Sequence, residues 1–127
     1  MDSIISSENY LWARKLLDGA AARHQAIASN LANLETPGYK RVDLTPDFEK
    51  QLAAMARQGR WDSVRHLKAE VMVDTAAQPL RPDGSTVEPE RELMEMNRNA
   101  LNYEFLTHYV SDSIRQLKMA ATGRPQA

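Results

Sequence analysis

The sequence lacks cysteine entirely, and it lacks any long apolar run. Without cysteine, disulfides and thiolate chemistry are excluded. No uninterrupted apolar stretch approaches the roughly 18 residues that a membrane-spanning helix needs. Residues 1–5 do not show the basic region, apolar core and small-residue cleavage site of a secretory signal. We therefore expect neither a membrane span nor a cleavable signal peptide.

An excess of charge of one sign is also missing. The 127 residues include 16 basic and 17 acidic side chains, which are mixed along the chain and leave a net charge of -1. Proteins that bind the phosphate backbone usually carry a basic stripe, so we expect no nucleic-acid partner. The hydrophobic content of 43% is too high for a disordered chain. The length favours one domain, residues 1–127.

Patterns for catalysis, cofactors or metals are sparse. The histidines His24, His66 and His108 are scattered along the chain. Glu104 and His108 are four residues apart, but this spacing is more typical of an exposed helical pair than of two metal ligands. The glycines stand alone, so no phosphate-binding loop is predicted. We expect no catalytic, cofactor-binding or metal site, no small-molecule substrate and no enzymatic activity.

The clearest positive signal is a helical period near the N-terminus. Small and apolar residues follow at steps of three and four: Tyr10, Ala13, Leu17, Ala20, His24, Ile27, Leu31 and Leu34. This row, the N-terminal seam, predicts an amphipathic helix over residues 6–35, about 40 Å long at a rise of 1.5 Å per residue. Gly19 lies off the seam, and we expect it to cost about 1 kcal/mol relative to alanine.

The C-terminal part repeats this period and predicts a helix over residues 88–122. Its row, the C-terminal seam, is Leu93, Met96, Ala100, Tyr103, Thr107, Val110, Ile114, Leu117 and Ala121. Pro89 suits a first turn, and three acidic residues complement the helix dipole there: Glu88, Glu90 and Glu92. We interpret these carboxylates as helix-start charges. The two helices are expected to pair through their seams as an antiparallel, coiled-coil-like hairpin.

Residues 36–87 are predicted to hold a turn, a short helix and a variable, partly β segment, in a fold that is otherwise mainly α. The short helix begins near Thr45, contains Phe48 and Leu52, and ends at Gly59. Residues 69–74 alternate weakly and indicate a short strand. Pro82-Asp83-Gly84 is typical of a tight turn.

The end of the first helix is unusually elaborate, because it reads ASNLANLETPGYKR over residues 28–41. Pro37 and Gly38 fit the central positions of a type II turn, in which glycine supplies a positive φ. Asn30 and Asn33 can bond either to freed carbonyls or to a neighbouring subunit. The plain alternative is a well-made helix stop.

Two pairs of motifs in this chain resemble one known family. ASNLAN at residues 28–33 and TPGYKR at residues 36–41 look like the N-terminal signature of bacterial flagellar rod and hook proteins. DGSTVEPERE at residues 83–92 and NALNY at residues 99–103 are similar to the corresponding stretches of the B-type proximal rod proteins. Glu88-Pro89 replaces the usual Asp-Met of that family. The C-type rod proteins share the first signature.

This resemblance implies a structural subunit of the proximal rod in the flagellar basal body. Such subunits polymerise through their terminal helices into a hollow shaft between the inner-membrane ring and the distal rod. The implied partners are copies of itself, other rod proteins, the inner-membrane ring, the ring–rod junction protein and the export gate. The implied location is the periplasmic rod, reached through the flagellar export apparatus.

The residues expected to form subunit interfaces come from both seams and from the turn. They are Leu17, Ile27, Asn30, Leu31, Asn33, Leu34, Thr36, Pro37, Gly38, Tyr39, Lys40, Arg41, Leu93, Met96, Tyr103, Val110, Ile114 and Leu117. Three alternatives remain open at this point: a C-type rod protein, a cytoplasmic helical export adaptor or chaperone, and a small helical DNA-binding domain. The even charge argues against the last of these.

Overall fold

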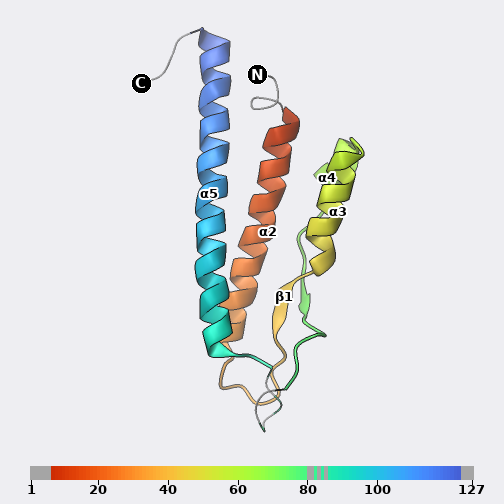
Figure 1. Ribbon diagram of the computed structural model, residues 1–127, viewed down its shortest axis with the longest axis vertical. Helices are drawn as coiled ribbons and strands as arrows, with labels where there is room; N and C mark the ends of the chain where they lie inside the picture. Colours follow the sequence, from red (N-terminus) through yellow and green to blue (C-terminus); the bar gives the residue numbers. More distant parts are fainter. Residues whose placement is uncertain (1–6, 80–81, 83, 85, 124–127) are drawn as a thin grey trace.

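The computed structural model describes residues 7–79, 82, 84 and 86–123. The elements in chain order are α2 (Ser7–Ala32), β1 (Val42–Leu44), α3 (Pro46–Arg57), α4 (Trp61–His66), β2 (Val71–Val73) and α5 (Pro89–Thr122). Helices α2 and α5 lie side by side and run in opposite directions (Figure 1). The predicted mainly α fold with an antiparallel hairpin is therefore confirmed. None of the described helices is apolar over a long enough stretch to cross a membrane.

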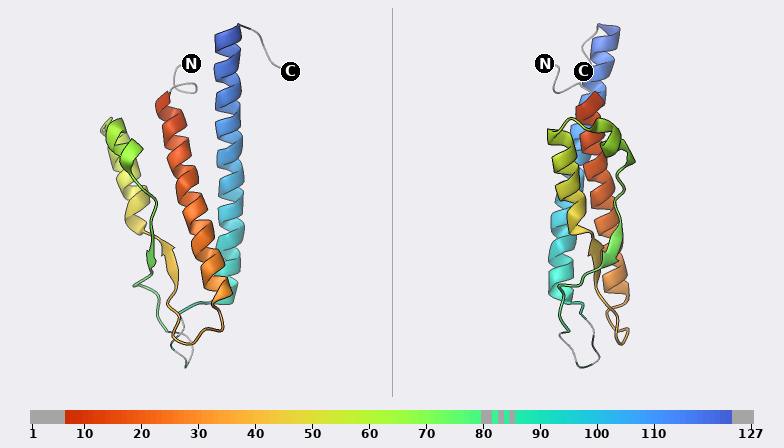
Figure 2. Two further views of the ribbon diagram at one scale, coloured as in Figure 1. Left: turned by 180° about the vertical axis from the view of Figure 1, so that it is seen from behind. Right: turned by 90° about the vertical axis from the view of Figure 1, so that its right-hand side faces the viewer.

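Helix α2 lies between two different neighbours. On one side it packs against α5, and on the other it packs against α3, α4 and the two strands (Figures 1 and 2). α2 ends at Ala32, three residues before the predicted end, and residues 33–35 form turns. The amides of Asn33 and Leu34 bond back to carbonyls of the helix. The predicted start and end of the last helix lie within one residue of those of α5.

The contact between α2 and α5 uses small and polar side chains. On α2 the buried residues Ala13, Ala20 and Ile27 recur every seven positions, in agreement with the N-terminal seam. On α5 the buried residues also recur every seven positions, but they are Glu92, Asn99, Leu106 and Ser113. The side chain of Asn99 donates a hydrogen bond of 2.9 Å to the carbonyl of Ala20.

The prediction that the C-terminal seam packs on α2 is therefore wrong for part of the seam. The row beginning at Glu92 faces α2, and the seam members Leu93 and Ile114 are rotated from it by about 100° toward solvent. The seam members Met96 and Val110 each lie four residues after a buried position, about 40° around the helix, and are half-buried.

Small and hydrogen-bonding residues occupy the contact between α2 and α5. Small residues let the two helices approach closely, and Asn99 satisfies a carbonyl of α2. Leu106 is the large apolar member of this buried row, and most of the other large apolar side chains of α5 are left on the surface.

A second, apolar core lies on the other side of α2. Its buried members are Leu44, Phe48, Leu52 and Val64, and half-buried residues of α2 such as Trp12 pack against them. Gly19 contributes to this packing, since a Cβ atom there would lie 2.8 Å from Cε1 of Phe48. The expectation that Gly19 is merely a weak point of the helix is therefore wrong, because the missing side chain makes room for the phenyl ring.

The middle segment contains more regular structure than predicted. The short helix around Phe48 and the strand within residues 69–74 are confirmed as α3 and β2. The sequence did not predict α4 or β1. β1 and β2 are antiparallel, with Asp43 opposite Met72. In the expected turn at residues 82–84, Gly84 has a φ of 81°, and Asp83 lies outside the described residues.

Candidate functional site

The turn after α2 has the predicted geometry. The amide of Tyr39 donates to the carbonyl of Thr36 at 3.2 Å, and Gly38 has a φ of 73°. These values are those of a type II turn with proline and glycine at its centre. A Cβ atom added at position 38 would have no neighbouring atom within 4 Å, so only the backbone conformation requires glycine here. The turn directs the chain from the end of α2 into β1.

The two asparagines at the end of α2 have different tasks. The side chain of Asn33 bonds within its own helix end, since its Nδ2 donates to the carbonyl of Ser29 at 2.9 Å. Asn30 is completely buried, and its side chain pairs with the backbone of Val42 in both directions, each at 2.9 Å. It also donates to Oε2 of Glu92 at 3.2 Å and accepts from the hydroxyl of Tyr39 at 3.3 Å. The side chain of Asn30 thus forms the two hydrogen bonds with Val42 that a neighbouring strand would form, and it connects α2, β1 and α5.

Arg41 is the centre of a polar network with three buried and two half-buried members, Asn30, Arg41, Glu92, Asp43 and Asp74, which we call the Arg41 cluster. Nε of Arg41 bonds to Oε1 of Glu92 at 2.5 Å, and its NH1 bonds to carboxylate oxygens of Asp74 at 2.8 Å and Asp43 at 3.1 Å. The side chains of Arg41 and Glu92 are 3% and 0% exposed. The cluster therefore connects the turn, both strands and the first turn of α5 at one end of the hairpin.

The backbone around Arg41 strengthens this connection. Its amide donates to Oγ1 of Thr86 at 2.7 Å, and its carbonyl accepts from the amide of Asp74 at 2.8 Å. The amide of Thr86 donates to the carbonyl of Tyr39 at 3.3 Å. Through these bonds, the residues just before α5 lie against the residues just after α2. The spacing and direction of the two long helices are thereby set at this end.

The carboxylates of the cluster stabilise the charged form of Arg41. Burial alone would lower the pKa of Arg41, but the hydrogen bond and charge of Glu92 and the charge of Asp43 outweigh it and raise that pKa. Arg41 is therefore cationic wherever the protein is folded. A buried carboxylate such as Glu92 requires such a partner, because an unpaired ion in the interior is strongly unfavourable.

Glu92 stands in the first turn of α5, as expected for a helix-start charge, but sequence reasoning missed that it is buried. It lies at the start of α5, but it points inward to Arg41 and Asn30. Glu88 and Glu90 are exposed, as expected for helix-start charges. Glu92 stands seven residues before Asn99 and fourteen before Leu106, the buried row of α5. This seven-residue spacing was the available sign that Glu92 is buried. It was overlooked because most members of the row are polar.

The predicted interface residues fall into three groups by exposure. Buried within the chain are Ile27, Asn30 and Arg41. Half-buried are Leu17, Leu31, Asn33, Leu34, Tyr39, Met96 and Val110. Exposed are Thr36, Pro37, Gly38, Lys40, Leu93, Tyr103, Ile114 and Leu117. The structure brings Asn30, Arg41 and Tyr39 together around the turn, whereas the exposed members of α5 are spread along the helix. Their contacts with neighbours stay a prediction.

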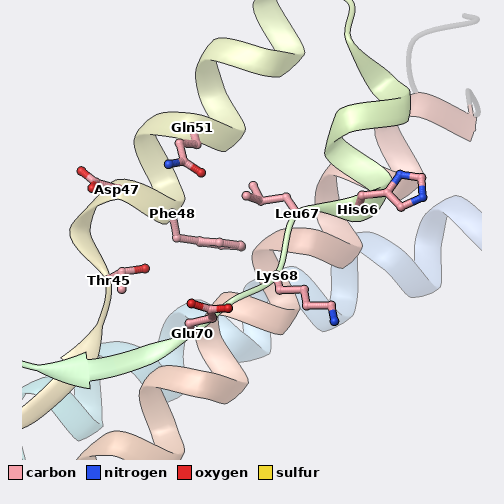
Figure 3. Close-up of a pocket in the computed structure, with 8 residues that line it drawn as sticks. All are labelled: Thr45, Asp47, Phe48, Gln51, His66, Leu67, Lys68 and Glu70. Carbon is pink, nitrogen blue, oxygen red and sulfur yellow. The ribbon is translucent and has the colours of Figure 1, made fainter.

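A pocket at the opposite end of the strands does not suggest catalysis. It has a volume of about 360 Å³ and lies between α3, α4 and the chain leading to β2 (Figure 3). Asp47 and His66, which carry a carboxylate and an imidazole, lie at opposite ends of it (Figure 3). His66 bonds instead to the carbonyl of Asp62 at 2.8 Å.

Glu104 and His108 lie 4.0 Å apart and are exposed. Within the described ranges, no group of three potential ligands is placed to hold a metal ion.

The chain is an α-helical hairpin that is fixed at one end by the Arg41 cluster and carries large exposed apolar side chains along its longer helix. Exposed apolar surface of this kind is typical of proteins that interact with partners. Comparison with known proteins specifies the family. A family model described as "Flagella basal body rod protein" matches residues 18–40. This stretch contains the second half of α2 and most of the turn that follows it. The flagellar basal body rod protein FlgB of Aeromonas hydrophila is 32% identical over 111 residues, covering 80% of this chain and 83% of that protein. The chain belongs to the FlgB family of flagellar basal body rod proteins.

Two further relatives cover most of both chains. FlgB of Escherichia coli (strain K12) is 29% identical over 118 residues, which are 80% of this chain and 84% of that protein. FlgB of Aquifex aeolicus is 29% identical over 114 residues, which are 89% and 92%. The similarity therefore extends well beyond the turn motif and includes both long helices. The resemblance deduced from the motifs is confirmed, and it points to a family of structural rod proteins.

Proposed function

We propose that this chain is a structural subunit of the proximal rod of the bacterial flagellar basal body. It polymerises through α2 and α5 into the hollow shaft that joins the inner-membrane ring and the export gate to the distal rod. Its partners are copies of itself, other rod proteins and the ring–rod junction protein. It reaches the periplasmic rod through the flagellar export apparatus.

The observation that carries this proposal is the exposed apolar surface of α5 in a member of the FlgB family. Leu93, Tyr103, Ile114 and Leu117 are 38 to 48% exposed, and they lie on one flank of the helix. A monomer gains nothing from such a row in water, whereas an assembly buries it at about 25 cal/mol per Å² of apolar surface. The Arg41 cluster supports the same proposal, because a fixed hairpin presents this row in the same geometry in every subunit.

Cell fractionation tests the proposal. A chromosomal deletion is complemented with a tagged copy of the chain, and basal bodies are purified from swimming cells. We expect the chain to co-purify with basal bodies and the deletion to abolish swimming. A chain found only in the soluble fraction, with basal bodies still complete, would instead support a cytoplasmic adaptor. Replacement of the deleted gene by a C-type rod gene serves as the control, and we expect it not to restore swimming.

A further inference from the structure

Helix α5 turns a largely polar row toward α2 and keeps much of its apolar seam outside. The side chains of the inward row are 0 to 6% exposed: Glu92, Asn99, Leu106 and Ser113. Four large members of the C-terminal seam are 38 to 48% exposed: Leu93, Tyr103, Ile114 and Leu117. Hydrophobic burial alone would favour the opposite orientation, because the seam carries far more apolar surface than the inward row. Another interaction must therefore hold α5 in the observed rotation.

The rotation that would bury the seam is small. Seam members lie one or four positions after members of the inward row, which places them about 100° or 40° around the helix. A rotation of about 70° about the axis of α5 would thus bring the middle of the seam onto α2. The contact surface of α2 contains Ala13 and Ala20, whose small side chains would leave room for the larger side chains of the seam.

Two polar side chains of the inward row bond directly to other parts of the chain. Asn99 donates to the carbonyl of Ala20 at 2.9 Å. Glu92 accepts hydrogen bonds from Arg41 and from Asn30. The rotation would break all of these bonds, and buried polar groups that lose their partners are unfavourable.

We infer that Glu92 and Asn99 form a rotational lock, which keeps the C-terminal seam turned away from α2. The two residues are seven positions apart on one face of the helix, or about 10 Å along its axis. Two fixed points on a line along the helix surface define the rotation of the helix, whereas a single point would still let it pivot. Ser113 does not belong to the lock, because its hydroxyl bonds within α5 to the carbonyl of Tyr109 at 2.9 Å.

The lock reduces apolar burial inside the subunit and preserves a defined outer surface. Buried polar groups are often no more stabilising than apolar replacements, but in some proteins they select one arrangement among several. A seam packed against α2 would be unavailable to other molecules. The use of the outward seam in assembly rests on the proposed function, whereas the lock is a property of the single chain.

Thiol labelling of the isolated chain tests the lock, since the natural sequence has no cysteine. Ala100→Cys places a reporter on the exposed seam, and Ser113→Cys places one in the inward row. Chains that carry one reporter each are treated with a maleimide under native conditions. With the lock intact, the reporter at position 100 should react at least about tenfold faster, because a buried thiol reacts only through local opening.

The double variant Glu92→Ala with Asn99→Ala removes both fixed points. Arg41 keeps its ion pairs with Asp43 and Asp74 in this variant, so its buried charge is still paired. We expect the order of the two labelling rates to reverse, because the rotation carries position 100 toward α2 and position 113 away from it. Alanine is chosen because leucine would make the inward row apolar and hold it in place.

The matched control is Glu95→Ala with Asn102→Ala, which changes the same residue types at the same spacing. Glu95 is half-buried and Asn102 is exposed, and both lie outside the inward row. The control should keep the natural order of labelling. Asn99→Ala alone, which retains the pair of Glu92 with Arg41, should shift the ratio of rates in the same direction by a smaller factor. This single variant decides the question if circular dichroism shows that the double variant does not fold.

The outcomes separate the lock from the proposed function. A folded double variant that is less stable to urea but keeps the natural order of labelling would overturn the lock. As a second measurement, incorporation of the double variant into basal bodies should fall about tenfold or more, while the control is incorporated normally. Normal incorporation of a chain whose labelling order is reversed would overturn the role of the outward seam. Absence of the natural chain from basal bodies would overturn the proposed function and leave the labelling result standing.

Discussion

Nε of Arg41 lies 2.5 Å from Oε1 of Glu92, across 51 residues of sequence, and both side chains are buried. This pair joins the turn after the first long helix to the beginning of the last one. The remaining acceptor of Glu92 is used by Asn30, so the carboxylate is satisfied on both oxygens. The pair and its neighbours form the fixed end of the hairpin, from which both helices extend.

A double-mutant cycle tests the pair. Arg41→Met alone should destabilise the protein by about 3–5 kcal/mol, because the buried carboxylate of Glu92 loses its cationic partner. Glu92→Leu alone should cost less, because Arg41 keeps its ion pairs with Asp43 and Asp74. The double variant should be less destabilised than the sum, since no buried ion remains, and Asp43 and Asp74 are 29% and 20% exposed and can be hydrated. Urea unfolding measures all four proteins. Exposed Glu90→Leu is the matched control, with an expected change within about 0.5 kcal/mol. Strict additivity would contradict the coupling.

A pair of glycine variants separates the direction of the turn from stability. Gly38→Val should cost about 1–3 kcal/mol, because valine is strained at a φ of 73°. Gly59 has a φ of 69° and equally open surroundings, so Gly59→Val should cost about the same. Helix content by circular dichroism should barely change in either. We expect only Gly38→Val to reduce incorporation into basal bodies, since it misdirects Tyr39 and Arg41. Equal incorporation of both variants would mean that the turn is only a helix stop.

The parts of the fold that depend on local chemistry were predictable. The three-and-four spacing predicted both long helices, and the Pro-Gly pair predicted the positive φ of Gly38. Neither prediction needs a distant partner. The strand β2 and the helix α3 were likewise visible from alternation and from the Thr45-Pro46 start.

The parts that depend on distant partners were not predictable. Glu92 contacts Asn30 across 62 residues, and nothing near Glu92 distinguishes it from exposed Glu90. Gly19 owes its role to Phe48, which lies in a different helix. The true contact row of α5 was hidden because three of its four members, Glu92, Asn99 and Ser113, are polar. Interpreting apolar spacing alone therefore selected the neighbouring, exposed row.

Gly19→Ala tests the close packing of α2 on α3. Helix propensity predicts stabilisation by about 1 kcal/mol. We expect destabilisation instead, because the new methyl group would lie 2.8 Å from the ring of Phe48. In a Phe48→Leu background, which removes the ring edge, Gly19→Ala should be neutral or stabilising. Thermal unfolding of the four proteins decides the sign. Stabilisation by Gly19→Ala in the natural background would show that the ring moves away without cost.

Hydrogen exchange should reveal a gradient along α5 in the isolated protein. The buried row of this helix ends at Ser113, and Ile114 and Leu117 are about 40% exposed. Amides of residues 92–106 should therefore be protected by the Arg41 cluster and α2, while those of residues 114–122 exchange through local fraying. Mass spectrometry of exchanged peptides measures both segments. Uniform strong protection up to residue 122 would show that the helix end needs no neighbour.

Ile114→Asp tests whether the flank of α5 is an assembly surface rather than part of the subunit's own core. The side chain is 38% exposed, so the free energy of unfolding of the isolated subunit should change by less than about 1 kcal/mol. In an assembly the same carboxylate would be buried among apolar side chains, which costs several kcal/mol when it is unpaired. Incorporation into basal bodies and swimming should therefore be lost. Gln116→Asp, two residues away and exposed, adds the same charge and should be tolerated. Swimming Ile114→Asp cells with complete basal bodies would place the subunit contact elsewhere on the hairpin.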